Sequence, residues 1–203
     1  MYAIVENKKV VKTFNNPKKL VINNVRYSTK IFSLWSVAEK KAIGLYEIEY
    51  DNSKKKDEEW YINTNQTIAY KTTGDKVVAS YGTATAKKIA DTLWTEQDKT
   101  DGKIREGDDV GDVATEGLKT IKKRMIDNQC AGLLAPSDWM VVKATETGET
   151  MDSGWKTWRA SVRTKCNSMQ TQIDNASDVD ALAALFTRNE SGVRPLGEFP
   201  VKA

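Results

Sequence analysis

The chain has 203 residues, of which 39% are hydrophobic and 29% are charged, and its formal net charge is +3. It is long enough for one or two domains with a usable core and too apolar to be a disordered chain. The small net charge gives no reason to expect nucleic-acid binding, and the lack of any histidine removes the commonest general base and transition-metal ligand.

The N-terminal part predicts short strands joined by tight turns. The expected strands are Tyr2–Val5, Val10–Phe14, Leu20–Ile22, Val25–Tyr27 and Leu45–Tyr50, followed by a hairpin of Trp60–Lys71 and Lys76–Thr83. Asn23-Asn24 suits a two-residue hairpin turn, because asparagine tolerates positive φ. Ser36 and Glu39 have the spacing of a capping box and Gly44 can end a helix, so one short helix is expected between the strands.

Residues 95–116 predict a linker. They contain eight acidic residues, three basic residues and three glycines, and the glycines disfavour a continuous helix. A loop of this length is unusual inside a compact domain. We therefore expect an N-terminal β-rich domain over residues 1–94, with a net charge of +6, and a helical C-terminal domain over residues 117–203. The expected fold class is α+β, with short hairpins and one short helix followed by a helical hairpin or bundle.

The C-terminal part predicts four helices and an extended tail. The expected helices are Gly117–Leu134, a helix capped by Ser137-Asp138 that ends at Gly148, Ser153–Asn175 and Asp178–Phe186. Pro136 separates the first two helices. On the first helix, the expected apolar face consists of Leu118, Ile121, Met125 and Ile126. The outward-facing residues are expected to be Lys119, Lys122 and Lys123.

The longest predicted helix carries one apolar stripe with steps of three or four residues, which favours packing against another helix or a partner chain. The candidates for helix packing or an interface are Trp139, Trp155, Trp158, Val162, Cys166, Met169 and Ile173. The three tryptophans of this set are expected in the core. Trp60 follows a charged loop and is the candidate for an exposed contact. Arg159 and Arg163 lie beside the stripe and are expected to bridge to Asp138 or Glu146.

No motif for catalysis, cofactor binding or metal binding stands out. The chain has neither a phosphate-binding glycine loop nor a GxSxG motif. The stretch from Asp98 to Asp108 superficially looks like a calcium loop, but Lys99 falls where an acidic ligand belongs. Cys130 and Cys166 are expected to be reduced core thiols. The sequence predicts no catalytic residue, no cofactor and no metal site.

Two segments of the C-terminal part stand out, Leu133–Gly148, which reads LLAPSDWMVVKATETG, and Trp158–Arg163, which reads WRASVR. They resemble the C-terminal region of phage tail-fibre-assembly-like proteins of the cyanophage type. The family pattern is Asp-Trp, a helix, a loop and a helix with (Tyr/Trp)-Arg-x-x-(Leu/Val)-Arg. Similar but weaker likenesses are LAALF at Leu182–Phe186, RPLGEFP at Arg194–Pro200, IFSLWS at Ile31–Ser36 and AIGLY at Ala42–Tyr46. The resemblance implies a non-enzymatic role in the tail fibre or baseplate.

Three hypotheses follow. The first is a structural component of the virion tail, assembled in the host cytoplasm, bound to fibre or baseplate proteins and present in several symmetric copies, with no membrane or nucleic-acid partner. A cytoplasmic origin fits the N-terminus, which reads as a strand rather than a signal peptide, and the lack of a run long enough for a membrane span. The second is a transient tail-fibre chaperone that leaves before the virion is complete. The third is a carbohydrate- or receptor-binding module, with exposed aromatic side chains beside convergent carboxylates.

Overall fold

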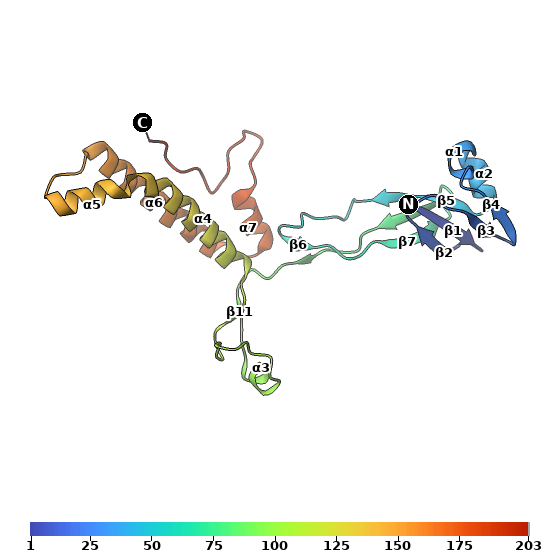
Figure 1. Ribbon diagram of the computed structural model, residues 1–203, viewed down its shortest axis with the longest axis horizontal. Coiled ribbons are helices and arrows are strands. Elements are labelled where there is room, and N and C mark those ends of the chain that lie inside the picture. Colours follow the sequence, from blue (N-terminus) through green and yellow to red (C-terminus); the bar gives the residue numbers. More distant parts are fainter. Residues whose placement is uncertain (203) are drawn as a thin grey trace. The chain divides into compact units, whose positions relative to one another are not determined.

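The computed structural model describes residues 1–202 and has the predicted α+β fold, with β-sheets first and helices after them (Figure 1). The chain forms two compact units, Met1–Thr85 and a second that starts at Ala86, which we call the β unit and the helical unit. The boundary comes earlier than expected. Residues 95–116, which we expected to link the two parts, lie inside the helical unit.

The strands are β1 (Tyr2–Glu6), β2 (Lys9–Phe14), β3 (Leu20–Ile22), β4 (Val25–Tyr27), β5 (Leu45–Asp51), β6 (Tyr61–Ile62), β7 (Thr67–Lys71), β8 (Lys76–Ser80), β9 (Thr85–Ala86), β10 (Thr92–Leu93) and β11 (Val113–Thr115). The helices are α1 (Ile31–Leu34), α2 (Val37–Ala42), α3 (Glu96–Thr100), α4 (Leu118–Leu134), the 3-10 turn η1 (Ala135–Ser137), α5 (Asp138–Thr147), α6 (Ser153–Asn175) and α7 (Val179–Phe186). Most of the predicted strands and helices are present, whereas α1, α3, β9, β10 and β11 were not predicted.

A mixed five-stranded sheet in the order β2-β1-β5-β8-β7 builds the β unit. Only β5 and β8 pair in parallel, and the two edge strands, β2 and β7, also contact each other, so the sheet curls. Successive residues of β1 point to opposite faces. One face buries Ile4, Phe14, Leu20, Ile22, Ile31 and Leu45 beneath α1 and the β3–β4 hairpin, and the other buries Ala3, Tyr46, Ile48, Val77 and Ala79.

The turns of the β unit have the predicted chemistry. Asn23 and Asn24 join β3 to β4 with φ of 49° and 60°, the left-handed conformation that asparagine tolerates. The capping box of Ser36 and Glu39 is formed at the start of α2. Gly44, with φ of 78°, follows this helix and its carbonyl accepts a 2.8 Å hydrogen bond from the Val5 N–H. A side chain at Gly44 would press on the Val5 carbonyl, so both the conformation and the close approach require glycine there.

Trp60 was predicted to be an exposed contact, and this is wrong. Its side chain is only 5% exposed. The charged loop before it folds back in a turn in which the Asp57 carbonyl accepts hydrogen bonds from the N–H groups of Trp60 and Tyr61, at 3.2 and 2.9 Å. This turn takes the indole out of solvent immediately after the charged residues, so the polarity of the preceding loop was a poor guide to its burial.

In the helical unit, α4 and α6 run side by side and α7 packs against α6 (Figure 1). The buried positions of α4 are Leu118, Lys122, Ile126 and Cys130, which follow one another at intervals of four residues. Lys122 was expected outside and is instead 6% exposed, with its ammonium 5.0 Å from the ring centroid of Phe186 on α7. A lysine can occupy this buried position of α4 because its methylene stem packs against apolar neighbours while its ammonium group lies over an aromatic ring.

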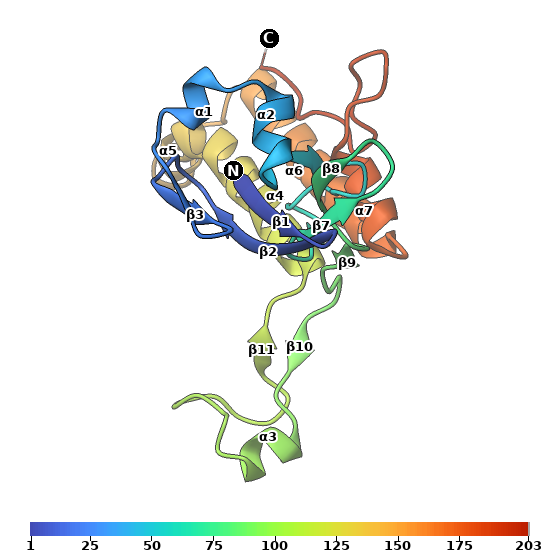
Figure 2. The same cartoon turned by 90° about the vertical axis from the view of Figure 1, so that its right-hand side faces the viewer.

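Residues 92–116 form an acidic arm rather than a featureless linker. β10 and β11 pair as a narrow antiparallel ladder that leads away from the start of α4 and carries α3 beyond it (Figure 2). Trp94 organises this arm. Its backbone N–H donates to the Asp112 carbonyl and its own carbonyl accepts from the Gly111 N–H, both at 2.9 Å, and its indole N–H donates to Asp108 at 2.9 Å. The glycines end turns here with positive φ, as at Gly111.

Candidate interaction surface

The resembling motifs Asp138-Trp139 and Trp158-Arg159 meet in space through a buried guanidinium. Arg159 is 4% exposed. Its Nη1 donates to the Leu134 carbonyl at 2.7 Å and to the Ser137 hydroxyl, and its Nη2 pairs with the Asp138 carboxylate. The predicted bridge to Asp138 is therefore confirmed. These acceptors lie at the end of α4, in η1 and at the start of α5, so one side chain of α6 fixes the corner where the chain turns between those helices.

The predicted bridge from Arg163 is wrong, because within residues 1–202 its side chain makes neither an ion pair nor a hydrogen bond. Arg163 lies one turn beyond Arg159, on an exposed part of α6. The acceptors at the corner are already used by Arg159. A sequence pattern places both arginines on one side of the helix but does not tell which of them meets the corner.

The stripe of α6 is confirmed as a helix-packing surface at four positions. Val162, Cys166, Met169 and Ile173 are each at most 5% exposed. Trp155 and Trp158 are half-buried at the first turns of α6, where their rings meet edge to face with centroids 5.6 Å apart. The Trp158 indole N–H donates to the Pro200 carbonyl at 3.0 Å, so the C-terminal tail returns to the start of this helix.

Cys130 and Cys166 are buried free thiols, as predicted. Burial is the first cause that raises the pKa of Cys166 to about 12, and its neighbours Cys130 and Asp127 raise it further. The protonated thiol is the unreactive form. The two residues therefore behave as small apolar side chains of the α4–α6 interface.

Trp139 was expected in the core, and this is wrong, since 59% of the residue is exposed. The helix that carries it, α5, contains no buried residue. It is held at its first turn by the Arg159 corner and ends at Gly148, which has φ of 72°. Only Met140 and Ala144 of α5 are half-buried, and Val141 and Val142 remain 41% and 53% exposed.

A groove of about 470 Å³ lies between α5 and the start of α6. Its apolar lining consists of Trp139, Met140, Ala144, Met151 and Trp155, and its polar lining includes Lys143, Glu149 and Asp152. Lys143 and Glu149 form an ion pair of 2.8 Å beside the apolar side chains. Two tryptophans and two methionines at one open groove suit an adaptable apolar contact. We call this site the α5–α6 groove.

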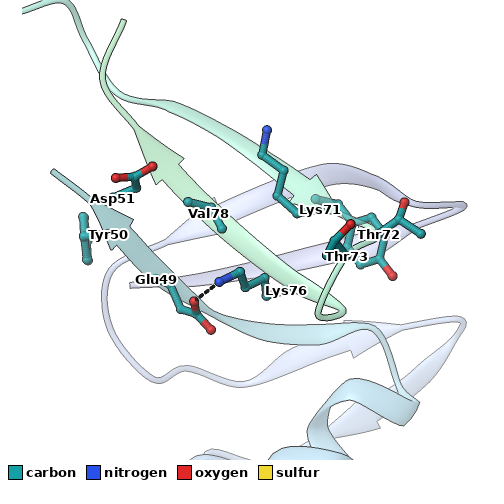
Figure 3. A pocket seen from close by; sticks show the side chains of 9 residues that line it. Glu49, Tyr50, Asp51, Lys71, Thr72, Thr73, Lys76 and Val78 are labelled. Atoms are coloured by element: carbon teal, nitrogen blue, oxygen red, sulfur yellow. Dashed lines mark ion pairs between the residues drawn. The ribbon is translucent and has the colours of Figure 1, made fainter. Parts of the chain in front are cut away.

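A second, shallow groove of about 780 Å³ lies on the outer face of β5, β8 and β7 (Figure 3). It is lined by Glu49, Tyr50, Asp51, Tyr70, Lys71, Thr72, Thr73, Lys76 and Val78. Glu49 is held by Lys76 at 3.0 Å, the contact drawn as a dashed line. Hydrogen bonds from Ser53 lower the pKa of Asp51, which is the opposite of the change that a general acid needs.

Within residues 1–202, no group of three or more His, Cys, Asp or Glu side chains is arranged to hold a metal ion. The same residues include no helix that is both long and apolar enough to span a membrane. Comparison of the chain with models of protein families, with curated proteins and with solved structures finds no match.

Proposed function

We propose that this chain is a non-enzymatic structural component of a phage tail that binds tail-fibre or baseplate proteins. The observation that carries the proposal is α5, a helix of ten residues that buries none of them and exposes Trp139. A helix this short is marginally stable alone in water. A partner that covered Trp139 would therefore stabilise α5 as well as gain an aromatic contact.

The α5–α6 groove has the composition of a binding hot spot. Tryptophan and methionine are enriched in the centres of protein interfaces, where a few buried aromatic anchors contribute most of the affinity. Trp139 lies 59% exposed beside Trp155, which is half-buried and fixed against Trp158. A partner side chain entering this groove would meet one rigid and one free indole.

The identity of the partner rests on the resemblance to phage tail-fibre-assembly-like proteins. The ion pair between Asp138 and Arg159 joins the two resembling motifs. Together they set the direction in which α5 leaves α4. A motif that keeps Asp-Trp at one end and Trp-Arg at the other would keep the exposed indole at a fixed position. This supports a fixed docking geometry for a tail protein.

The test is co-purification of the tagged full chain after expression with the tail-fibre and baseplate proteins of its own genome. Trp139→Ala should reduce recovery of the tail partner at least about tenfold, the loss of one interface anchor. Leu34→Ala is the matched control, since Leu34 is 74% exposed on α1 of the β unit. Equal recovery with Trp139→Ala and the unmodified chain contradicts the role of the groove, and absence of every tail protein contradicts the proposed function.

A transient chaperone would pass the same co-purification. Mass spectrometry of purified particles separates the two roles, because a structural component remains in the finished tail and a chaperone does not.

Carbohydrate or receptor binding is the second candidate, and the groove of Figure 3 favours it. Glu49 and Asp51 present two carboxylates on one face of β5 at this groove, and Tyr50 between them in the strand is 52% exposed. Aromatic faces and carboxylates are the groups that bind sugar rings and hydroxyls. Loss of binding to an array of host-surface glycans on Tyr50→Ala, with Trp139→Ala unaffected, would support this candidate over the first.

A further inference from the structure

A long stretch of the β unit carries only positive charge. Residues 7–38 contain seven lysine and arginine residues and no aspartate or glutamate. All seven are exposed, and they are Lys8, Lys9, Lys12, Lys18, Lys19, Arg26 and Lys30. We call this stretch the basic segment. Glu6, which lies opposite Lys9 in the pairing of β1 with β2, is the nearest acidic residue along the chain before it.

Within residues 1–202, none of the seven cations of the basic segment forms an ion pair, and the Lys18 ammonium lies 4.8 Å from the ring centroid of Phe14. Several other lysines of the β unit are matched, as in the pairs Lys40–Glu47, Lys41–Asp75 and Lys76–Glu49, at 3.2, 3.4 and 3.0 Å. The charge of the basic segment is therefore available to a partner.

A shallow groove at the β3–β4 hairpin concentrates this charge. The groove has a volume of about 560 Å³ and is lined by Lys19, Leu20, Val21, Arg26, Tyr27 and Ser28. Val21 and Arg26 are direct cross-strand partners, and Val21 is 64% exposed. We call this site the basic groove; it offers two cations and one exposed aliphatic side chain, that of Val21.

The acidic arm of the helical unit has the opposite character. Residues 92–116 contain eight acidic and three basic residues, a net charge of −5. Three of the acidic side chains build the arm itself, since Asp98 caps α3, Asp108 accepts from Trp94 and Asp112 accepts from the Asp109 N–H at 2.7 Å. Within residues 1–202, the carboxylates of Glu96, Glu106 and Asp109 have no hydrogen-bond or ion-pair partner.

The arm is ordered without a core of its own. Neither α3 nor the strands β10 and β11 contain a buried residue, and Leu93 and Val113 are 49% and 41% exposed. Its order comes from the capping box of Thr95 and Asp98 and from the bonds around Trp94. A preformed projection that presents carboxylates and two aliphatic side chains has the charge and the apolar content to complement the basic groove.

We infer that the acidic arm of one copy of this chain docks on the basic groove of a second copy. The contact joins two different surfaces, so it is heterologous and repeats from copy to copy, as a closed ring or a filament. This inference deepens the proposed function, in which several copies of the chain are arranged symmetrically. It rests on the proposed function only for the expectation that several copies assemble. Charge complementarity carries it, because the basic segment has seven unpaired cations, two of them at the basic groove, and the acidic arm has three unpaired carboxylates.

A nucleic acid is a weaker match for the basic segment. Proteins that track single strands interleave cations with exposed aromatic rings on which bases stack. In the basic segment Phe14 is buried and Tyr27, Phe32 and Trp35 are only half-exposed, because they pack in the core cluster of the β unit. The exposed side chains among the cations are aliphatic, which fits a protein surface.

The experiment is sedimentation velocity of the purified full chain at several concentrations and two ionic strengths. At about 50 mM NaCl the chain should associate with increasing concentration, and at about 500 mM NaCl association should weaken at least tenfold, since salt screens exposed charges. The variant Lys19→Glu with Arg26→Glu should weaken association at least tenfold at low salt. The variant Glu106→Gln with Asp109→Asn should weaken it in the same direction.

A mixture of these two double variants gives the sharpest result. We call Lys19→Glu with Arg26→Glu the groove variant, and Glu106→Gln with Asp109→Asn the arm variant. The intact arm of the groove variant can dock on the intact groove of the arm variant. No second contact can form between them, so association should stop at one copy of each. The control is Lys54→Glu with Lys71→Glu, which changes net charge by the same amount on exposed lysines outside the basic segment. All substituted side chains are exposed, and unchanged thermal unfolding would show that the variants fold.

Three outcomes would overturn the inference. The unmodified chain could remain monomeric at low salt, the control could dissociate as readily as the groove variant, or the two variants mixed could fail to associate. Salt-sensitive binding of a mixed-sequence oligonucleotide that is lost in the groove variant, without self-association, would assign the basic groove to nucleic acid instead. None of these results depends on a tail protein, so failure here is distinguishable from failure of the proposed function.

Discussion

The carboxylate of Asp91 accepts a 2.6 Å hydrogen bond from the backbone N–H of Gly117, the N-cap residue of α4. Its second oxygen accepts from the Thr120 hydroxyl at 2.9 Å. Gly117 has no side chain with which to cap the helix, so a residue far back in the sequence does so. The base of the acidic arm and the first turn of α4 are thereby joined. The Leu118 and Lys119 N–H groups add hydrogen bonds of 3.0 Å to the carbonyls of Lys88 and Ile89, which lie between β9 and β10.

Asp91→Asn should destabilise the helical unit by about 1 kcal/mol at neutral pH, because asparagine is uncharged and has one acceptor oxygen where Asp91 uses two. The hydrogen bond from Gly117 and the one from Thr120 lower the pKa of Asp91 below 3.8 in the folded chain. A lowered pKa means that the stabilisation is present above the unfolded-state pKa and is lost as pH falls through the lower folded-state value. Urea unfolding followed by helical circular dichroism at pH 7 and near pH 3 measures both effects.

The pH dependence is the discriminating readout for Asp91. The free-energy difference between the unmodified chain and Asp91→Asn should shrink in acid, because both side chains are then uncharged. A difference that stays constant from neutral to acid pH would show that the carboxylate charge at Asp91 contributes nothing to the cap.

Gly117→Ala should cost about 1–3 kcal/mol, the usual range for an atom forced into a filled space. The new Cβ would overlap the backbone carbonyl of Ala90, which cannot move aside as a flexible side chain could. Gly132, within α4, is the matched control, because a Cβ there would meet nothing within 4 Å. Gly132→Ala should stabilise by up to about 1 kcal/mol, since alanine is the better helix former; opposite signs for the two variants in urea unfolding are the expected result.

Arg159→Met should cost about 2–4 kcal/mol, because it removes the donor to the buried Ser137 hydroxyl and to Asp138, and it leaves the Leu134 carbonyl with the Ser137 hydroxyl as its side-chain donor. Asp138→Ala should cost no more than about 1 kcal/mol, since the Asp138 side chain is 59% exposed and its ion pair is screened. Chemical denaturation of the two variants and their combination would compare them. A larger loss from Asp138→Ala than from Arg159→Met would contradict this account of the corner.

Met169→Ala should cost about 2–5 kcal/mol through the cavity it leaves between α4 and α6. Met169 is fully buried, whereas Ile121, predicted on the apolar face of α4, is 40% exposed. Ile121→Ala should therefore cost less than about 1 kcal/mol. Thermal unfolding ranks the pair, and equal losses at the two positions would mean that Ile121 packs more tightly than its exposure indicates.

Local sequence signals predicted much of the secondary structure, for reasons that act over a few residues. The Asn23-Asn24 turn, the Ser36–Glu39 capping box and the break at Pro136 depend on backbone preferences and short-range hydrogen bonds. The α6 stripe follows from helical period. These features need no knowledge of what lies across the fold, and each is present in the structure.

Burial of single large side chains was not predictable in the same way. Trp60 is buried and Trp139 is exposed, the reverse of the expectation for each. Tryptophan has an apolar body in either case, so its type does not reveal whether a neighbour covers it. The missed member of the α6 stripe, Arg159, did have a signal, because it lies four residues after Trp155 and three before Val162 on the same face of the helix.

The sequence by itself determined the α+β order, the limits of the longer helices and the division of charge between a basic first part and an acidic middle stretch, because these depend on composition, period and turn residues along the chain. Only the tertiary structure decided that residues 92–116 form an ordered arm, that Arg159 selects Asp138 and that α5 is left uncovered. Those outcomes depend on which groups from distant segments meet, and a hydrogen bond such as that from Gly117 to Asp91 has no counterpart in local sequence.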